Sequence, residues 1–451
     1  MKASSFRGIS WNKLRLLLAS VKKSAFVRNL LIVMSGTALA QVLGYALSPI
    51  ISRLYSPADF GIFGSFGAAL SIIGAVITLD YSQAIMLPKQ KDEAWALFLL
   101  SCLTSTLIAI FFLLGSLIFP SHILKVINAP QTWILGVLVL GVFLSGLGQA
   151  CQAWCVRVKA FKATSASQII RSLTSNGTQA GLGYLKAGAP ALISAVILGD
   201  LLATLNLAKV VARDLRELNK TVRWRRIWDF AKEYHDFPVY SASTNMINAL
   251  SQGLPIFLLT HYYGIATAGA YAFGIRILSA PMELVLRALR QVLYQKAAET
   301  HNDGRSIFSL YVKFTGGLFA LGLVPALIMI IWAPPIFSWI FGAQWHLAGI
   351  FARGIIIWLV FMFSNLPATI CARIVRMQRQ MFLYNLVLLV LRTLALVLGG
   401  LYLSSATTVL LFSLVGAGMN VVYILIIGIA IKNQEGAASW NEAFNDLKGT
   451  Q

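Results

Sequence analysis

The stretch 51–64, ISRLYSPADFGIFG, separates two long apolar segments and carries an arginine, a Ser-Pro pair, an aspartate and two glycines. Proline disfavours helical geometry in the residue before it, so the Ser-Pro pair predicts the end of one helix and the start of the next. Asp59 is well placed to cap the second helix, and Gly61 and Gly64 would let a neighbouring backbone come close. The stretch therefore predicts a tight turn between two closely packed helices.

The flanking apolar segments are typical of the whole chain. Of its 451 residues 58% are hydrophobic and 12% are charged, and the mean hydropathy is +0.74. A soluble protein of this length exposes far more charge, so the composition predicts a multi-pass membrane protein. Backbone groups in a bilayer must be satisfied within the protein, which leaves helices or a closed barrel. Barrel strands alternate apolar and polar residues, whereas runs such as 107–119 are continuously apolar. We therefore expect an all-α fold.

The apolar runs predict twelve membrane spans, each near the roughly 20 residues that a bilayer core requires. The predicted spans are 30–51, 60–84, 94–119, 132–155, 165–185, 189–211, 237–260, 266–289, 307–332, 350–372, 380–402 and 405–431. They divide the chain into a basic amphipathic N-terminal segment 1–29, an N-lobe 30–212, a basic linker 213–236, a C-lobe 237–431 and a tail 432–451. The apolar part of the N-terminal segment is too short for a signal peptide.

Basic residues gather in alternate loops, most densely in the segment 213–232. The opposite loops hold little more than Arg53, Lys125 and Lys186. Because cytoplasmic loops carry the excess of lysine and arginine, both termini are predicted to lie in the cytoplasm. The formal net charge of +21 is then explained by membrane orientation, and no nucleic-acid partner is expected.

The four cysteines and five histidines do not form the pattern of a metal site. Cys151 and Cys155 stand four residues apart, but no pair of histidines accompanies them. We interpret all four cysteines as buried apolar residues and expect neither a metal nor a cofactor.

An internal repeat relates the two halves of the chain. The stretch SPIISRLYSPADFGIFGSF at 48–66 resembles LPIFLLTHYYGIATAGAYAF at 254–273. The matched pairs are Pro49 with Pro255, Tyr55 with Tyr262, Gly61 with Gly269, and Phe63 with Tyr271. A second match, IIRSL at 169–173 with VLRTL at 390–394, places an arginine in the fifth span of each half. Because both halves begin by leaving the cytoplasm, we predict parallel repeats, with two pseudo-symmetric six-helix lobes around a central cavity.

Charged residues inside the spans are the first candidates for a binding site, since each costs roughly 2.5–3.5 kcal/mol at the bilayer centre. The eighth span carries Arg276 and Glu283, and Arg287 and Arg290 follow on the same helical face near its cytoplasmic end. This stripe predicts a cationic cavity wall. The alternative is a structural ion pair between Arg276 and Glu283, with the other two arginines extended to the lipid head groups.

Neutral polar stripes in spans 1 and 7 are further candidates. The residues concerned are Gln41 and Tyr45 in span 1, and Asn245, Asn248 and Gln252 in span 7. Such side chains either line a cavity that accepts a sugar or form hydrogen bonds between helices.

Five more charged residues complete the candidates. Arg171 and Arg392 occupy matching positions of the repeat, and Arg392 lies nearer the middle of its span. Asp80 and Asp200 are either partners of an arginine or sites that respond to protons. Arg53, at the predicted periplasmic turn, is a gate candidate.

Four stretches of the chain resemble the polysaccharide-export family, the Wzx-type O-antigen flippases of the multidrug/oligosaccharidyl-lipid/polysaccharide exporter superfamily. They are the first turn at 48–66, WCVRVKAFKATSASQIIRSL at 154–173, the start of the second lobe at 237–285, and IFGAQWHLAG at 340–349. The resemblance covers essentially the whole chain. Its motifs are loose and specify the family but not the substrate.

The resemblance implies a flippase for an undecaprenyl-pyrophosphate-linked oligosaccharide of lipopolysaccharide or a similar surface polysaccharide. The head group would pass from the cytoplasmic to the periplasmic leaflet of the bacterial inner membrane by alternating access. It also implies that intramembrane arginines bind the pyrophosphate or acidic sugars, with candidates Arg276, Arg287, Arg290, Arg171 and Arg392. A proton or sodium gradient, or the membrane potential, would supply the energy. Membrane lipids, a polysaccharide polymerase and a chain-length regulator are the implied partners of a functional monomer.

The main alternative is a small-molecule drug exporter of the same superfamily, which would rely on buried acidic residues rather than arginines. A flippase for another lipid-linked precursor is a second alternative. A membrane enzyme would need a long periplasmic loop or a cytoplasmic portion with clustered carboxylates for a metal. The sequence has neither, so we expect a transporter and not an enzyme.

Overall fold

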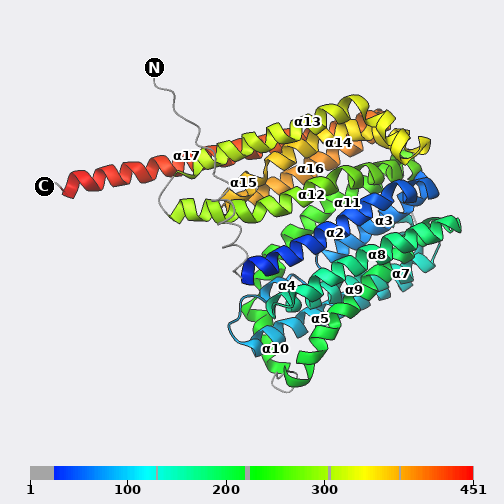
Figure 1. The fold of residues 1–451 in the computed structure, drawn as a ribbon, viewed down its shortest axis with the longest axis horizontal. Coiled ribbons are helices and arrows are strands. Elements are labelled where there is room, and N and C mark those ends of the chain that lie inside the picture. The colour runs from blue at the N-terminus through cyan, green and yellow to red at the C-terminus, as the bar shows by residue number, and fades with distance from the viewer. Residues whose placement is uncertain (1–24, 128–130, 219–223, 303–305, 375–376, 450–451) are drawn as a thin grey trace, which may run out of the picture.

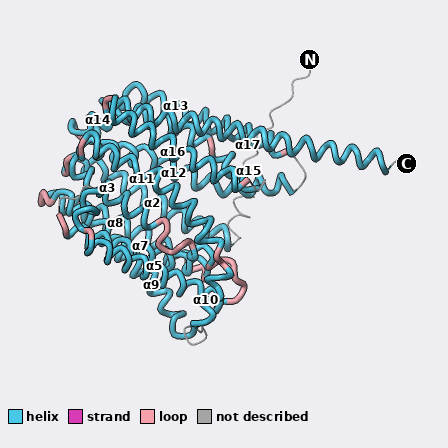
Figure 2. Tube along the Cα trace, turned by 180° about the vertical axis from the view of Figure 1, so that it is seen from behind, coloured by secondary structure: helices cyan, strands magenta, loops and turns pink. Residues whose placement is uncertain are grey.

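The computed structural model describes residues 25–127, 131–218, 224–302, 306–374 and 377–449. Within these ranges the chain is built of helices joined by short turns, without a β-strand (Figures 1 and 2). The prediction of an all-α fold is confirmed. Most of the N-terminal segment predicted at 1–29 lies outside the described residues.

The helices of the first half are α2 Ala25–Leu54, α3 Pro57–Gly74, α4 Tyr81–Ala84, α5 Lys91–Ile118, α6 Pro120–Ile127, α7 Trp133–Arg157, α8 Phe161–Tyr184, α9 Gly188–Leu218 and α10 Trp224–Glu233. Those of the second half are the π-helix η1 Phe237–Ala242, α11 Ser243–Tyr263, α12 Ile265–Asn302, α13 Ile307–Phe341, the 3₁₀-helix η2 Ala343–Trp345, α14 His346–Ser364, α15 Leu366–Ile374, α16 Gln378–Tyr402 and α17 Ser405–Gly449.

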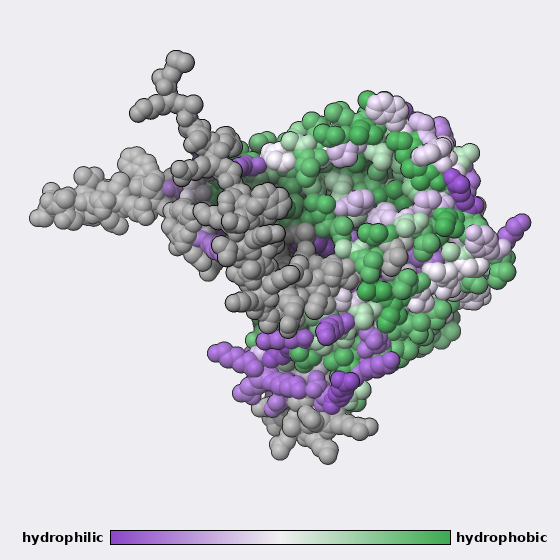
Figure 3. All heavy atoms as spheres, viewed as in Figure 1, coloured by the Kyte–Doolittle hydropathy of each residue, from purple (hydrophilic) through white to green (hydrophobic). Residues whose placement is uncertain are grey.

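Nine helical segments of the described chain are long and apolar enough to cross a membrane. The chain is thus a multi-pass membrane protein. The other three predicted spans coincide with α2, α8 and α11. In α2 the segment Ala38–Leu54 is apolar but shorter than the nine, whereas α8 and α11 carry many polar residues. The count of twelve stays a prediction. Hydrophobic side chains cover much of the face seen in Figure 3, as expected of a surface in contact with lipid.

Two predicted spans are interrupted. The second, predicted as 60–84, ends as a helix at Gly74, and a turn leads to α4 through Leu79 and Asp80, which both have positive φ. Such a backbone is uncommon for residues other than glycine and breaks the helix. The tenth, predicted as 350–372, is divided between α14 and α15 at Asn365, two residues before Pro367. Proline has no backbone N–H and therefore fits the first turn of α15 but cannot continue the hydrogen bonds of α14.

Two helices cross the predicted domain boundaries. α9 continues beyond 212 to Leu218, and α17 continues beyond 431 to Gly449, so the predicted tail begins as part of a helix. The division into lobes, linker and tail at those residues stays a prediction.

The opening turn is organised by a capping box. Ser56 accepts a hydrogen bond from the backbone N–H of Asp59, and the carboxylate of Asp59 accepts one from the N–H of Ser56. Pro57 takes the first position of α3, where its missing N–H is not needed. The predicted helix break is confirmed. Asp59 takes part in the cap as predicted, but the N-cap residue is Ser56, and Asp59 is the third residue of the helix.

The helices form two groups that meet along α3 and α12. In Figure 1 the helices α2 to α9 lie on one side and α11 to α17 on the other. Helix α3 of the first group packs against α11 and α12 of the second. At their crossing a Cβ on Gly61 would overlap the carbonyl oxygen of Ile265, and one on Gly269 would overlap that of Pro57. The repeat-matched glycines Gly61 and Gly269 therefore touch each other, and only glycine permits this approach.

Replacing Gly61 with alanine is expected to destabilise the packed form by about 1–3 kcal/mol, because the added methyl group meets backbone rather than a flexible side chain. The thermal unfolding midpoint of the protein in lipid nanodiscs measures this effect. Gly67→Ala is the matched control on the same helix, since its Cβ would meet nothing within 4 Å. Equal midpoints for the two variants would contradict the close contact.

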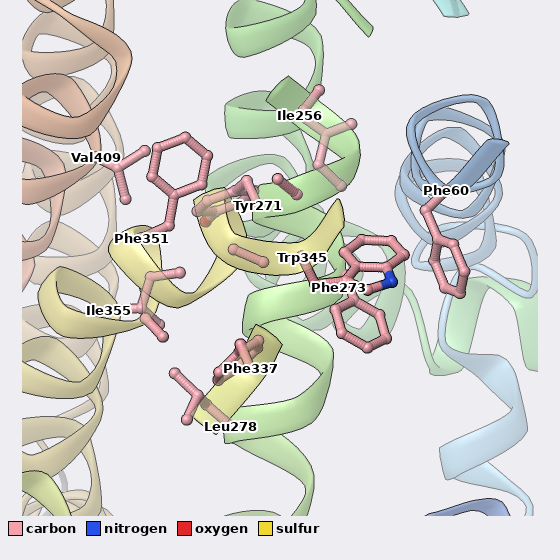
Figure 4. Packing of buried hydrophobic residues seen from close by; sticks show 14 of the residues in the cluster. Phe60, Ile256, Tyr271, Phe273, Leu278, Phe337, Trp345, Phe351, Ile355 and Val409 are labelled. Atoms are coloured by element: carbon pink, nitrogen blue, oxygen red, sulfur yellow. The ribbon is translucent and has the colours of Figure 1, made fainter. Parts of the chain in front are cut away.

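Aromatic side chains fill the junction beside these glycines (Figure 4). Phe60 of α3 contacts Phe273 and Trp345 of the second group, with ring centres 5.2 and 5.0 Å apart. Nearby, the main-chain oxygen of Ser52 accepts hydrogen bonds from the side chains of Gln344 and Trp345. The two groups are therefore joined firmly at the end that carries the α2–α3 turn.

Hydrogen bonds refine the register of the repeat. The hydroxyl of Tyr55 donates to the carbonyl of Gln179 in α8 at 2.6 Å, and that of Tyr263 donates to Gly399 in α16 at 2.8 Å. Helices α8 and α16 are the fifth span of each half. Tyr263 therefore makes in the second half the contact that Tyr55 makes in the first. It follows Tyr262, the residue that the sequence repeat matches with Tyr55.

Candidate functional site

A cavity of about 1360 Å³ lies within the second group of helices. Its lining residues all fall between Asp236 and Tyr423, on η1, α11, α12 and α14 to α17. A central cavity lined by residues of both lobes is predicted from the sequence. The observed cavity differs from that prediction, because its lining residues all belong to the second half of the chain. A ligand site of about 300–1000 Å³ is usual for small molecules, so this cavity has room for a larger ligand.

Two helices turn polar stripes toward the cavity. On α11 the stripe includes the predicted residues Asn245, Asn248 and Gln252. On α16 the lining residues are Met381, Phe382, Tyr384, Asn385, Leu388 and Arg392. Four of them, Met381, Asn385, Leu388 and Arg392, follow one another at steps of three or four. This spacing keeps one helical face toward the cavity, so the amide groups of α11 and the arginine of α16 border the same space.

Arg392 is the most unusual residue of the wall. Only 3% of it is exposed. Its guanidinium carbon lies 4.0 Å from the ring centre of Trp358 and 4.6 Å from that of Phe412. A Cβ on Gly416 would overlap its Nη2, so the absent side chain of that glycine makes room for the guanidinium. Stacking on aromatic faces stabilises a cation but does not neutralise its charge.

Several buried polar atoms in the lining of this cavity lack hydrogen-bond partners among the described residues. They are Nε and Nη2 of Arg392, Oδ1 of Asn365, the hydroxyl of Tyr423 and the hydroxyl of Ser251. All four residues line the cavity. Buried polar groups are nearly always satisfied, and each exception calls for an explanation such as a ligand or water. These exceptions lie together on one cavity.

A second cavity, of about 400 Å³, adjoins the first. It is lined by Arg287, Arg290, Tyr294, Thr369, Ile370 and Arg373, and three of these residues, Tyr294, Thr369 and Arg373, also line the larger cavity. The predicted residues Arg287 and Arg290 are exposed and meet Arg373 here. Three guanidinium groups around a small space favour phosphate or carboxylate oxygens.

The remaining members of the predicted stripe on span 8 do not act together. Glu283 lines the larger cavity, and its carboxylate lies 3.8 Å from Arg287, not beside Arg276. The alternative of a structural Arg276–Glu283 pair is therefore wrong for this structure. Arg276 instead faces Phe63 of the first group, 6.0 Å from its ring centre, and its carbonyl accepts a hydrogen bond from Tyr45.

Gln41 and Tyr45, on α2, do not line either described cavity. Tyr45 bridges the two helical groups through its hydrogen bond to Arg276. The Oε1 of Gln41 is buried and accepts no hydrogen bond from the described residues. Their role in substrate binding stays a prediction that these cavities do not support.

Arg171 and Asp200 form an ion pair within the first group. Nη2 of Arg171 on α8 donates to Oδ2 of Asp200 on α9 at 3.2 Å, and Nε contacts the other carboxylate oxygen. Of the two alternatives for Asp200, the arginine partner is the one that the structure supports. The guanidinium of Arg171 thus contacts both carboxylate oxygens of Asp200. Arg171 does not line either described cavity.

Replacing Arg171 with glutamine is expected to destabilise the protein by about 1–3 kcal/mol, because it leaves the carboxylate of Asp200 buried without its partner. The double variant Arg171→Gln/Asp200→Asn should recover most of this loss. Thermal unfolding midpoints in nanodiscs, compared in a double-mutant cycle, provide the measurement. A double variant no more stable than the single one would show that the two residues act independently.

The other two charged candidates lie at opposite ends of the junction. Asp80, in the break after α3, accepts a hydrogen bond from the hydroxyl of Ser241 in η1. Arg53 donates to the carbonyls of Trp339 and Ile340 at 3.0 and 3.2 Å. Both side chains therefore connect the two helical groups, and the gate role of Arg53 stays a prediction.

Several cavity residues were not among the sequence candidates. They include Trp358, Asn365, Arg373, Tyr384, Asn420 and Tyr423. Of these, Tyr384 could have been predicted from the sequence, since it lies on the same face of span 11 as Arg392. Asn365 and Asn420 are isolated amides in apolar spans. Only the structure reveals that the Nδ2 of Asn365 donates to Oδ1 of Asn420 at 2.7 Å.

The described residues contain no group of His, Cys, Asp and Glu that could hold a metal ion. All four cysteines are free. The larger cavity presents arginine, amide, hydroxyl and aromatic groups, together with the carboxylates of Asp236 and Glu283.

Comparison with known proteins gives a consistent result. Residues 50–349 match the profile of a family described as "Polysaccharide biosynthesis protein". The chain is 21% identical over 318 residues to the succinoglycan biosynthesis transport protein ExoT of Rhizobium meliloti (strain 1021). That match covers 68% of this chain but 60% of the length of the relative.

Two solved structures share the fold. The lipid II flippase MurJ in an inward closed conformation has a TM-score of 0.71 and 13% identity, over 92% of this chain and 93% of that one. An inward-facing multidrug-resistance MATE transporter has a TM-score of 0.66 and 14% identity, over 88% and 95%. These proteins are transporters or flippases, in agreement with the expectation of a transporter rather than an enzyme.

Proposed function

Because the chain belongs to the polysaccharide biosynthesis protein family, we propose that it is a flippase for a polyprenyl-pyrophosphate-linked oligosaccharide. The glycan head group crosses the bilayer in the polar cavity of the second helical group, while the lipid tail remains in the hydrocarbon. O-antigen units and related surface polysaccharides on undecaprenyl pyrophosphate are the proposed substrates. A polymerase would then extend the delivered units.

The observation that supports this proposal most strongly is the uncompensated charge of Arg392 in the wall of a large, amide-rich cavity. A buried cation is costly unless an anion accompanies it. The lining amides and hydroxyls suit the hydroxyl groups of sugars, and the aromatic rings suit their apolar faces. A cavity designed for a cationic drug would present carboxylates at this position instead.

The orientation follows from the charge of the loops. With both termini in the cytoplasm of a bacterium, the firmly joined end around Ser52 and Trp345 is periplasmic. The cavity then extends from the cytoplasmic end of the second group, near Asp236 and Arg373, to the middle of the membrane at Arg392. The described state is thus proposed to receive substrate from the cytoplasm.

Reconstitution tests the proposal. The full chain is placed in liposomes that contain an undecaprenyl-pyrophosphate disaccharide with a fluorophore on the sugar, and a membrane-impermeant quencher is added outside. We expect the protein to make nearly all of the fluorophore accessible, whereas protein-free liposomes expose only the outer leaflet. Inaccessible inner-leaflet lipid, together with transport of ethidium by the same liposomes, would overturn the proposal in favour of a drug exporter.

A further inference from the structure

Matching helices of the two halves pack differently in the middle of the chain's helical groups. In the first half, α2 and α8 make contact at several levels. The hydroxyl of Ser172 on α8 donates to the carbonyl of Ala40 on α2. A Cβ on Gly44 would lie 3.3 Å from Nδ2 of Asn176, and the hydroxyl of Tyr55 donates to α8 near the α2–α3 turn. The small residues of α2 permit this close packing.

The equivalent helices of the second half, α11 and α16, touch at the same end. Tyr263 donates to Gly399, and a Cβ on Gly400 would overlap the ring of Tyr262. The face of α11 that makes these contacts continues to Asn248, about four helical turns away. There it lines the larger cavity, as does the facing side of α16. The cavity therefore lies between α11 and α16, which stand on opposite sides of it.

The residues at matching positions account for this difference. We count back fifteen and eleven residues from the tyrosine that bonds to the fifth span of each half. The count gives Ala40 and Gly44 in the first half, and Asn248 and Gln252 in the second. Two larger, polar amides thus replace the small residues on which α8 packs. The second half holds a polar space where the first half holds a helix contact.

One flank of α16 leads from this space toward the lipid. Tyr384 lies on the flank beside α17, since its ring centre is 4.4 Å from that of Tyr423. Phe382 lies on the other flank, about 80° around the helix from the middle of the cavity-facing side. It lines the cavity and is also 36% exposed. Farther around the helix come the exposed residues Leu383 and Leu386, so the cavity meets the apolar surface at Phe382.

A second aromatic side chain borders the cavity on the side of α11. Tyr240 belongs to η1, which leads into α11, and it lines the cavity while 69% of it is exposed. Tyr240 and Phe382 both lie close to the beginning of their spans. In the proposed orientation this is the level of the cytoplasmic leaflet, where a lipid-linked substrate would enter.

We propose that the space between α11 and α16 is the passage through which the polyprenyl tail of the substrate leaves the cavity, with Tyr240 and Phe382 packed against the chain. This inference rests on the proposed function, and it specifies where the lipid part of the substrate binds. A substrate with its glycan in the cavity and its tail in the bilayer has to cross the cavity wall, and apolar contacts stabilise the tail at the crossing.

The opposite side of α16 does not offer such a passage. Helices α16 and α17 are in contact through Tyr384 and Tyr423 and, farther along, through Arg392, whose Nη2 a Cβ on Gly416 would overlap. A polyprenyl lipid has one chain whereas a phospholipid has two, so a passage bordered by two aromatic side chains suits the polyprenyl tail. A bilayer phospholipid in the same place is the outcome that the experiment must separate.

The experiment uses the full chain in lipid nanodiscs and an undecaprenyl-pyrophosphate disaccharide that carries a diazirine in its isoprenoid chain. After irradiation, mass spectrometry locates the label. We expect label on Tyr240 and Phe382 to exceed label on Val324 and Leu327 by about tenfold, the ratio of a modest binding preference. The latter two are exposed apolar residues of α13. A phosphatidylglycerol with the same diazirine is the control, and it should label both surfaces equally.

A substitution at the rim separates the tail from the glycan. Phe382→Ala should raise the KM for flipping of the glycolipid about fivefold, because an apolar contact with the tail is lost. It should leave the affinity for the lipid-free disaccharide unchanged by isothermal titration calorimetry. Val390→Ala is the matched control, since Val390 is an exposed residue of α16 that does not line either described cavity. It should change neither quantity.

Three results would overturn the inference. They are label spread evenly over the lipid-facing helices, label concentrated on α2 and α12, and enrichment of the phosphatidylglycerol label at the rim. The last would assign the passage to bilayer lipid. If Phe382→Ala does not fold, labelling of the wild-type protein decides alone. A protein that flips the glycolipid while its tail is labelled elsewhere refutes only the inference, whereas a protein that does not flip it refutes the proposed function.

Discussion

A disulfide between α3 and α12 is expected to stop transport completely and reversibly. A Cβ on Gly64 would lie 2.9 Å from the Cβ of Ala272, and disulfides span about 3.5–4.5 Å between Cβ atoms. A slight separation of the two helices therefore suffices for Gly64→Cys/Ala272→Cys to form the bond. If the proposed flipping proceeds by alternating access, this junction must open, so we expect oxidation to abolish glycan flipping in proteoliposomes and a reductant to restore it.

The single variants Gly64→Cys and Ala272→Cys serve as controls for the added side chains, and neither should respond to oxidation. The native cysteines Cys151, Cys155 and Cys371 are buried, so they are poor competitors for the engineered bond. Flipping that continues in a fully cross-linked protein would show that the α3–α12 junction is not a moving part.

Replacing Arg392 with alanine is expected to reduce export of the native lipid-linked glycan roughly a hundredfold while the protein still inserts in the membrane. Loss of one partner of a buried charge pair costs about 2–5 kcal/mol, and about 3 kcal/mol corresponds to that factor. The measurement is surface polysaccharide in a deletion strain that expresses the variant, together with the amount of lipid-linked glycan retained on the cytoplasmic side.

Arg353→Ala is the matched control for this substitution. Arg353 is an exposed arginine of α14 that donates to the carbonyl of Ile331 and does not line either described cavity. It should leave export unchanged. Wild-type export by Arg392→Ala at wild-type protein levels would remove Arg392 from the substrate path.

Local features of the fold were readable from the sequence because they depend on neighbouring residues. The capping box of Ser56 and Asp59 and the helix start at Pro57 follow from the chemistry of a few adjacent residues. The break at Asp80 was not readable, since its left-handed backbone is held by a contact with Ser241, more than a hundred residues away. Long-range contacts of this kind leave no periodic signal.

Part of the candidate functional site could also be predicted from the sequence, because helical spacing depends on residues that are close along the chain. The stripe of Asn245, Asn248 and Gln252 was visible as helical spacing, and the structure turns it toward a cavity. The same spacing on span 1 gave Gln41 and Tyr45, which the structure places elsewhere. A periodic stripe indicates which residues share a helix face. Whether that face lines a cavity or packs against another helix depends on how the other helices are arranged.

A helical membrane protein built of two related halves could be predicted from the residues alone, because hydrophobicity and repeat motifs are properties of order and composition. The pairing of Arg171 and, among the described residues, the lack of a carboxylate beside Arg392 became visible in the folded structure. The two arginines stand in similar motifs, IIRSL and VLRTL. They differ because one neighbouring helix brings Asp200 to the guanidinium and the other brings Gly416, and that difference leaves a charge available to a ligand.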